Sequence, residues 1–229
     1  MKIWQRIKAL FFWIEFIITT LILCILFLII KSQDKIWILR KYWAKFQKYA
    51  INYKIQLTGE LHPQTNLLLI NHQSLLDIVA LEDLCSKNIS WIAKKELGEI
   101  PVFKILIKKS KMICIDRSPK GLVKLLKEAK ERLKENRILA IFPEGTRSNT
   151  QKLLKFKVGA KILTEKLKLK VQPVVIVDSA KILNTKTFSA KSGNLKIIFL
   201  DPVDTSKENW LEQTREDMQK ILDFYRQEL

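Results

Sequence analysis

A histidine and an aspartate, His72 and Asp77, follow directly after a short apolar run, Leu67 to Ile70. An imidazole that is oriented by a carboxylate can take a proton from an alcohol, as in the base and acid of a catalytic triad. The same stretch also fits a helix capping box, with Ser74 as the cap and Asp77 in the first turn. The capping interpretation leaves His72 without a role, and spacing alone does not decide between the two.

A second polar loop follows the apolar run Ile138 to Phe142. It reads Pro143-Glu144-Gly145-Thr146-Arg147-Ser148. Gly145 permits a tight backbone turn, Thr146 and Ser148 offer hydroxyl groups, and the planar guanidinium of Arg147 matches the geometry of a phosphate. A plain surface turn would have the same composition. The glycine-rich patterns of nucleotide-binding loops are absent, so the sequence gives no support for nucleotide binding.

The elements that must position these loops alternate along the chain. Short apolar runs that predict buried strands are Leu67 to Ile70, Ile89 to Ile92, Met112 to Ile115, Ile138 to Phe142 and Val171 to Val177. Residues 51 to 57 alternate as a half-buried strand does, and helices are predicted from Pro119 to Asn136, capped by Ser118, and from Ser206 to Leu229. We therefore predict an α/β fold with a largely parallel or mixed sheet flanked by helices. Ligands of such sheets bind beyond the carboxyl ends of the strands, which is where both polar loops lie.

An apolar segment from Leu10 to Ile30 contains only Glu15, Thr19 and Thr20 as polar residues. As an α-helix it would be about 31 Å long, close to the thickness of a bilayer core. Glu15 leaves a charge-free part, Phe16 to Ile30, that is shorter than the roughly 18 residues typical of a spanning helix. A helix that spans the membrane and one that only dips into it both stay open. No small-residue cleavage site follows, so we expect the segment to be retained.

The next stretch, Ile36 to Tyr53, interleaves basic residues with aromatic and aliphatic ones. This spacing suits an amphipathic helix in the headgroup region, although a core-packed helix with one solvated face has the same pattern. More basic residues follow the apolar segment than precede it, which would put the rest of the chain in the cytoplasm. We predict membrane-associated helices over residues 1–50 and an α/β domain over residues 51–229.

The composition narrows the classes of partner. The chain has 229 residues and a net charge of +18, which favours anionic partners such as acidic lipid surfaces, phosphorylated substrates or nucleic acid. No nucleic-acid motif or single basic stripe is present, so we do not expect nucleic acid. Cys24, Cys85 and Cys114 suggest neither a disulfide framework nor a zinc site, and no HExxH pattern indicates a metal. Cys85 or Cys114 could pair with His72 as a nucleophile, but neither stands beside a suitable loop.

Together the two loops resemble the glycerolipid acyltransferase superfamily, which has an NHxxxxD block and an FPEGTRS block. Here these blocks are Asn71 to Asp77 and Phe142 to Ser148. Further stretches similar to family blocks are Ala93 to Leu97, Ile100 to Phe103, Ile115 to Arg117, Phe156 to Ala160 and Val171 to Val175. Ser110 stands where many members have glycine. The resemblance covers about residues 51 to 205.

The resemblance implies a fatty acyl transfer to the sn-2 hydroxyl of 1-acylglycerol-3-phosphate, giving phosphatidic acid. The acyl donor would be a thioester of acyl carrier protein or coenzyme A, with no metal or prosthetic group. His72 would be the base and Asp77 its orienting acid. The implied substrate-binding residues are Glu144, Gly145, Thr146, Arg147, Lys94 and Arg117. Glu144 would bond the glycerol part or lock Arg147 in place.

The same resemblance implies a bacterial-type enzyme at the cytoplasmic face of the inner membrane, with the lipid bilayer and a lysophospholipid as partners. Two other functions stay open. One is acylation of a different acceptor, such as a lysophospholipid with a larger head group or a lyso-ornithine lipid. The other is a non-catalytic basic protein of the membrane surface, which would tolerate the loss of His72.

Overall fold

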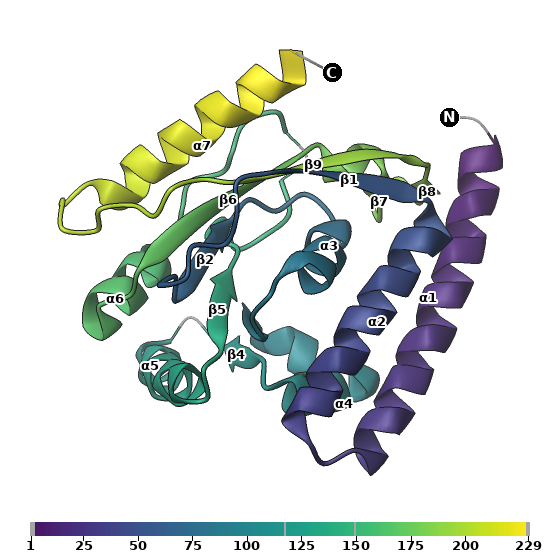
Figure 1. Cartoon of the computed structure of the whole chain (residues 1–229), viewed down its shortest axis with the longest axis horizontal. Helices are drawn as coiled ribbons and strands as arrows, with labels where there is room; N and C mark the ends of the chain where they lie inside the picture. The colour runs from purple at the N-terminus through teal and green to yellow at the C-terminus, as the bar shows by residue number, and fades with distance from the viewer. Residues whose placement is uncertain (1–2, 117, 149, 228–229) are drawn as a thin grey trace.

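The computed structural model describes residues 3–116, 118–148 and 150–227. Its centre is a seven-stranded sheet with the order β1-β9-β6-β2-β5-β3-β4 (Figure 1). The strands are β1 (Tyr53–Thr58), β2 (Leu67–Ile70), β3 (Ile89–Lys94), β4 (Ile113–Ile115), β5 (Ile138–Ile141), β6 (Val171–Val177) and β9 (Gly193–Phe199). All neighbouring pairs are parallel except β6 with β9. The predicted α/β fold with a mixed sheet is confirmed.

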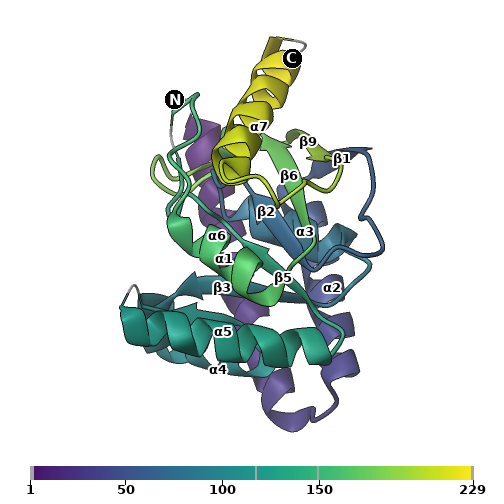
Figure 2. The same cartoon turned by 90° about the vertical axis from the view of Figure 1, so that its left-hand side faces the viewer.

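Helices cover both faces of the sheet, because side chains of a strand alternate between its two faces. On β2, Leu68 and Ile70 belong to a core shared with α1 (Ile3–Ile29), α2 (Gln33–Ile51) and α3 (Leu76–Leu84). Leu67 and Leu69 belong to a second core on the other face, shared with α5, α6 and α7, which Figure 2 shows on the near side. The bounds of these helices are α5 (Pro119–Lys134), α6 (Val158–Leu167) and α7 (Trp210–Gln227). A strand buried on both faces explains the uninterrupted apolar run at Leu67 to Ile70.

The first two helices run side by side at one end of the molecule (Figure 1). α1 contacts α2, the strand β8 (Ser189–Ala190) and α4 (Pro101–Ser110). Phe12 and Phe16 of α1 and Ala44 of α2 join the core on the first face of the sheet. The side of α1 away from these contacts is apolar and exposed, whereas α2 buries one face and exposes Tyr42, Phe46 and Tyr49 on the other. The core-packed interpretation of the 36–53 stretch is confirmed for the buried face of α2, and headgroup contact of the exposed face stays a prediction. The division into domains at residue 50 stays a prediction.

Several element boundaries differ from the predicted ones. The half-buried strand begins at Tyr53, because Ile51 is the last residue of α2. The last helix begins at Trp210 rather than Ser206, and its predicted end falls at residues 228–229, outside the described residues. α5 has the predicted start, with the Ser118 hydroxyl accepting a hydrogen bond from the Gly121 N–H at 3.0 Å. Strand β9, the small β7 (Leu183–Asn184) and β8 hairpin, and the 3₁₀ turns at Lys95–Glu99 and Ser179–Lys181 were not predicted.

Candidate active site

The His72 and Asp77 side chains meet at the carboxyl end of β2. The chain leaves β2 after Ile70, turns through the 71–75 loop and enters α3 at Leu76, which puts Asp77 in the first helical turn beneath the imidazole. His72 Nδ1 lies 2.8 Å from Asp77 Oδ2, and both side chains are buried. A carboxylate can only accept hydrogen bonds, so it holds the imidazole proton on Nδ1 and leaves Nε2 free to take a proton.

The predicted cap residue is wrong, because the N-cap of α3 is Leu75, which makes no side-chain capping bond, but the Asp77 carboxylate still binds the turn before the helix. Asp77 Oδ2 accepts the backbone N–H groups of Gln73 at 2.8 Å and Ser74 at 2.9 Å. The Ser74 hydroxyl accepts the Leu76 N–H at 3.1 Å. Asp77 thus binds the backbone N–H groups just before α3 and also orients the imidazole. The capping interpretation and the catalytic one therefore do not exclude each other.

Asn71 fixes the start of this loop to the neighbouring strand. Its side-chain amide donates to the carbonyl of Ile176 at 2.9 Å and accepts the N–H of the same residue at 2.7 Å. These two hydrogen bonds to backbone groups leave the Asn71 side chain little freedom. They hold the loop against β6, beside His72. Sequence reasoning gave Asn71 no role beyond its place in the motif.

An aromatic ring lies flat against the imidazole. Phe142 follows the last residue of β5, the neighbour of β2, and its ring centroid is 3.8 Å from that of His72 at an interplanar angle of 14°. This stack limits rotation of the imidazole out of its plane. Sequence reasoning treated Phe142 only as the end of a strand and as a motif letter.

Glu144 holds the backbone of His72. One of its carboxylate oxygens accepts the His72 N–H at 2.9 Å, and the other accepts the Leu154 N–H at 2.8 Å. Burial raises the pKa of Glu144, and these two backbone hydrogen bonds and the nearby His72 partly offset that effect. On the other side of His72, its carbonyl accepts the Ser148 N–H at 2.8 Å. The described carboxylate makes no hydrogen bond or ion pair with Arg147, whose partner is Thr185, so it does not lock Arg147 in place, and a bond to the glycerol part stays a prediction.

Arg147 lies on this same loop and is held from one side only. Its Nη1 donates to the Thr185 hydroxyl at 2.8 Å, and no other protein acceptor for the guanidinium is found within the described ranges. Gly145 has a positive φ of 69°, and its N–H donates to the Phe142 carbonyl at 3.0 Å, which closes the turn before Arg147. Thr146 is exposed. The guanidinium therefore keeps donors that a phosphate can use.

The remaining predicted residues are less closely joined to the site. Lys94 is exposed at the carboxyl end of β3, on the same side of the sheet as the carboxyl ends of β5 and β2. It makes no described contact with His72 or Arg147. Arg117 lies outside the described residues. A polar cavity of about 340 Å³ borders the site and is lined by Gln73 and Ser148 together with the cations Lys181 and Arg226.

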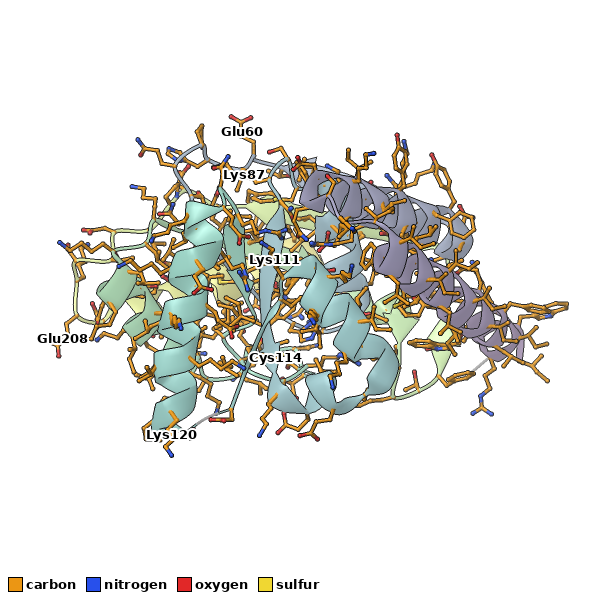
Figure 3. All side chains as sticks on the ribbon, turned by 90° about the horizontal axis from the view of Figure 1, so that it is seen from below. Glu60, Lys87, Lys111, Cys114, Lys120 and Glu208 are labelled. Carbon is orange, nitrogen blue, oxygen red and sulfur yellow. The ribbon has the colours of Figure 1, made fainter. Side chains whose placement is uncertain are left out.

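The cysteines do not join the site. Cys85 ends α3, opposite its Asp77 end, and burial raises the pKa of its thiol. Cys114 lies on the edge strand β4, between α4 and α5 (Figure 3), and burial raises the pKa of its thiol as well. A raised pKa lowers the fraction of reactive thiolate. No three His, Cys, Asp or Glu side chains converge in the described part of the chain, and independence from metals stays a prediction.

Comparisons with known proteins identify the family of the chain. The family model described as "Acyltransferase" matches residues 54–177. A 1-acyl-sn-glycerol-3-phosphate acyltransferase of Helicobacter pylori is 46% identical over 170 residues, which cover 72% of this chain and 72% of that protein. The chloroplastic LPAT1 of Arabidopsis thaliana, given the same name, is 32% identical over 73% of this chain and 48% of its own length.

A solved structure shares the fold. It is the crystal structure of PlsC, a 1-acyl-sn-glycerophosphate (LPA) acyltransferase from Thermotoga maritima, with a TM-score of 0.81. The similarity covers 98% of this chain and 97% of that one, at 21% sequence identity. The match includes the N-terminal helices as well as the sheet, because almost the whole of both chains is covered.

Proposed function

The chain belongs to the acyltransferase family, and from that premise we propose that it moves a fatty acyl group from an acyl thioester to the sn-2 hydroxyl of 1-acylglycerol-3-phosphate. The product is phosphatidic acid. The observation that carries the proposal is the 2.8 Å contact between His72 Nδ1 and Asp77 Oδ2, joined by backbone hydrogen bonds to the loop that bears Arg147.

The chemistry follows from the free imidazole nitrogen. His72 Nε2 takes the proton of the acceptor hydroxyl while the oxygen of that hydroxyl attacks the carbonyl carbon of the thioester. The new ester bond forms, the carbon–sulfur bond breaks, and the thiolate leaves and takes the proton from the imidazolium. Asp77 stabilises the positive charge of that imidazolium. Positioned base catalysis of this kind raises the rate of the reaction by a factor of about 10²–10⁴.

Arg147 supplies the alignment of the acceptor. Its unpaired donors bind the acceptor phosphate, and the Ser148–His72 backbone bond fixes the spacing between that phosphate and the imidazole. Holding one end of the acceptor places its hydroxyl at Nε2 and removes the entropy cost of orientation from the reaction. Thr146, exposed beside Arg147, offers a further hydroxyl to the phosphate.

The site also needs contact with membrane lipid, and α1 provides it. α1 is long and apolar enough to cross a bilayer. One of its sides is occupied by α2, α4 and β8, so hydrocarbon can reach only the other side, which carries Phe11, Ile14 and Ile18. We propose that α1 lies half-buried in the cytoplasmic leaflet of the inner membrane, with the exposed aromatic residues of α2 at headgroup level.

The test uses purified protein in detergent. It is supplied with 1-acylglycerol-3-phosphate, lysophospholipids with larger head groups and lyso-ornithine lipid, each with acyl carrier protein and coenzyme A thioesters, and products are identified by mass. We expect phosphatidic acid as the main product. His72→Ala should lower turnover by about 10²–10⁴ while binding to lipid vesicles persists. His62→Ala changes the only other histidine and should leave turnover intact. Normal turnover by His72→Ala would refute the proposal.

A further inference from the structure

Three rings lie nearly parallel at the active site. The Phe142 ring that stacks on His72 is itself stacked on Trp91 of β3, with ring centroids 5.4 Å apart and an interplanar angle of 17°. Trp91 is 3% exposed, and Phe142 is the ring that stacks on both Trp91 and the imidazole. Phe142 is only partly buried, so its position depends on the ring behind it.

The indole of Trp91 is fixed from behind by a buried carboxylate. Trp91 Nε1 donates to Glu82 Oε1 of α3 at 2.6 Å, and the same carboxylate is paired with Arg40 of α2. Arg40 also donates to the carbonyl of Ile89 at 3.0 Å, two residues before Trp91 on the same strand. Hydrogen bonds to a charged partner in a buried setting are among the strongest in proteins, so the indole has one defined orientation.

We propose that Trp91 is a positioning residue for the acyl transfer. It holds Phe142 flat against His72 and so directs Nε2 toward the acceptor hydroxyl, and Glu82 and Arg40 hold Trp91 in turn. The bond to Asp77 fixes the imidazole at Nδ1 only, and a ring held at one edge can still swing about that bond. The Phe142 face removes this freedom, and Trp91 keeps that face in place. The inference rests on the proposed acyl transfer for its catalytic consequence.

The experiment compares Trp91→Leu with Trp210→Leu. Trp210 is another buried tryptophan, but it lies in α7 in the core on the opposite face of the sheet, so its variant controls for the loss of an indole from a core. We expect Trp91→Leu to lower kcat by about tenfold with little change in KM, because the imidazole is misaligned while substrate contacts remain. Trp91→Phe retains a ring at this position and should restore most of kcat. Trp210→Leu should leave kcat near the wild-type value.

A spectroscopic readout separates positioning from general stability. The chain has only His62 and His72, so histidine-labelled protein gives two imidazole signals in NMR spectra. The His72 ring protons feel the ring current of Phe142, whereas His62 lies on another loop. Trp91→Leu should shift or broaden the His72 signals and leave those of His62 in place. Trp210→Leu should move neither.

A double variant tests whether Trp91 acts through Phe142. In a Phe142→Leu background, Trp91→Leu should cause almost no further loss of kcat, because the ring it supports is gone. Independent losses that multiply would overturn the inference, as would unchanged kcat and His72 signals in Trp91→Leu. If Trp91→Leu does not fold, Trp91→Met has a longer, more flexible side chain that adapts to the space without a ring, and it carries the same expectations. A wild-type protein that transfers no acyl group would instead refute the proposed function, and the NMR comparison would still decide the role of Trp91.

Discussion

At the scale of single residues, Asp77 shows how one side chain meets a local and a distant requirement. Its Oδ2 accepts two backbone N–H groups of its own loop and faces the imidazole. The S-x-x-D spacing predicted the local half of this arrangement. It left the contact with the imidazole as an alternative, which the family resemblance then favoured, because only the fold brings the loop back under His72. Glu144 shows the reverse case, since its partners His72 and Leu154 are distant in sequence and no local pattern predicted them.

Arg147 gives a prediction at this scale. Arg147→Lys keeps the positive charge but loses the planar fork that binds two phosphate oxygens. We expect the KM for 1-acylglycerol-3-phosphate to rise about tenfold, equivalent to about 1.4 kcal/mol, with a smaller change in kcat. Steady-state kinetics with varied acceptor measure both constants. Arg215→Lys is the matched control, because Arg215 pairs with Glu212 on the surface of α7, and it should leave KM unchanged. An unchanged KM in Arg147→Lys would place the phosphate elsewhere.

At the scale of elements, the apolar runs predicted the strands β2, β3, β4, β5 and β6 because each contains a continuous apolar segment, which is buried over most of its length except in β4, where only Ile113 is buried. β9 begins with the polar and small residues Gly193 and Asn194 and so lacked that signal at its start. Its antiparallel pairing with β6 and parallel pairing with β1 depend on contacts far apart in the chain. No local pattern contains the order of strands, so the position of β9 inside the sheet could not be predicted.

An ion pair helps to hold α7 in place. Because this pair includes a carboxylate, its contribution to stability should depend on pH. Arg226 of α7 donates to Asp178, just after β6, at 2.8 Å, and Lys181 lies 2.7 Å from the same carboxylate. Burial opposes ionisation of Asp178, but the hydrogen bonds to Lys181 and Arg226 outweigh it and hold its pKa below the usual value. The pair therefore stabilises the fold above the unfolded-state pKa of about 3.9, and this stabilisation is lost as the pH falls through the lower folded-state pKa.

Asp178→Asn tests this sign. Asparagine tolerates the positive φ of 49° at this position, so the substitution changes mainly the charge. We expect the free energy of unfolding at pH 7 to fall by about 1–2 kcal/mol, and the difference from wild type to shrink as the pH falls below about 4. Thermal unfolding across this pH range measures it. Asp223→Asn removes a more exposed carboxylate beside the same Arg226 and should have a smaller effect at pH 7. An equal difference at pH 3 and pH 7 would contradict the assignment.

At the scale of the whole molecule, the apolar side of α1 is exposed and has no protein partner in the described structure. It carries exposed residues along its whole length, from Ile3 to Ile29 (Figure 3). The sequence predicted an apolar helix here but left open whether it spans or dips. The packing of α1 against α2, α4 and β8 supports the proposed half-buried state, and that packing depends on residues from across the chain.

This side of α1 gives the last prediction. Ile14→Glu combined with Ile18→Glu adds two charges on exposed positions one turn apart. Charged side chains are costly in the hydrocarbon region, so we expect partitioning into anionic lipid vesicles to fall at least about tenfold. Vesicle sedimentation measures the bound fraction, and the fold is checked by thermal unfolding. Val123→Glu with Val158→Glu adds the same charge on exposed positions of α5 and α6 and should leave partitioning nearly unchanged. Equal partitioning of the two double variants would contradict the assigned face.

With α1 half-buried in one leaflet, as proposed, the protein would meet its acceptor by lateral diffusion within the plane of the bilayer. The relevant quantity is then the mole fraction of acceptor in that plane rather than its amount per volume of solution. Diluting the acceptor with inert lipid, at constant total acceptor, would slow turnover, whereas diluting the suspension with buffer would leave each bound molecule working at the same pace.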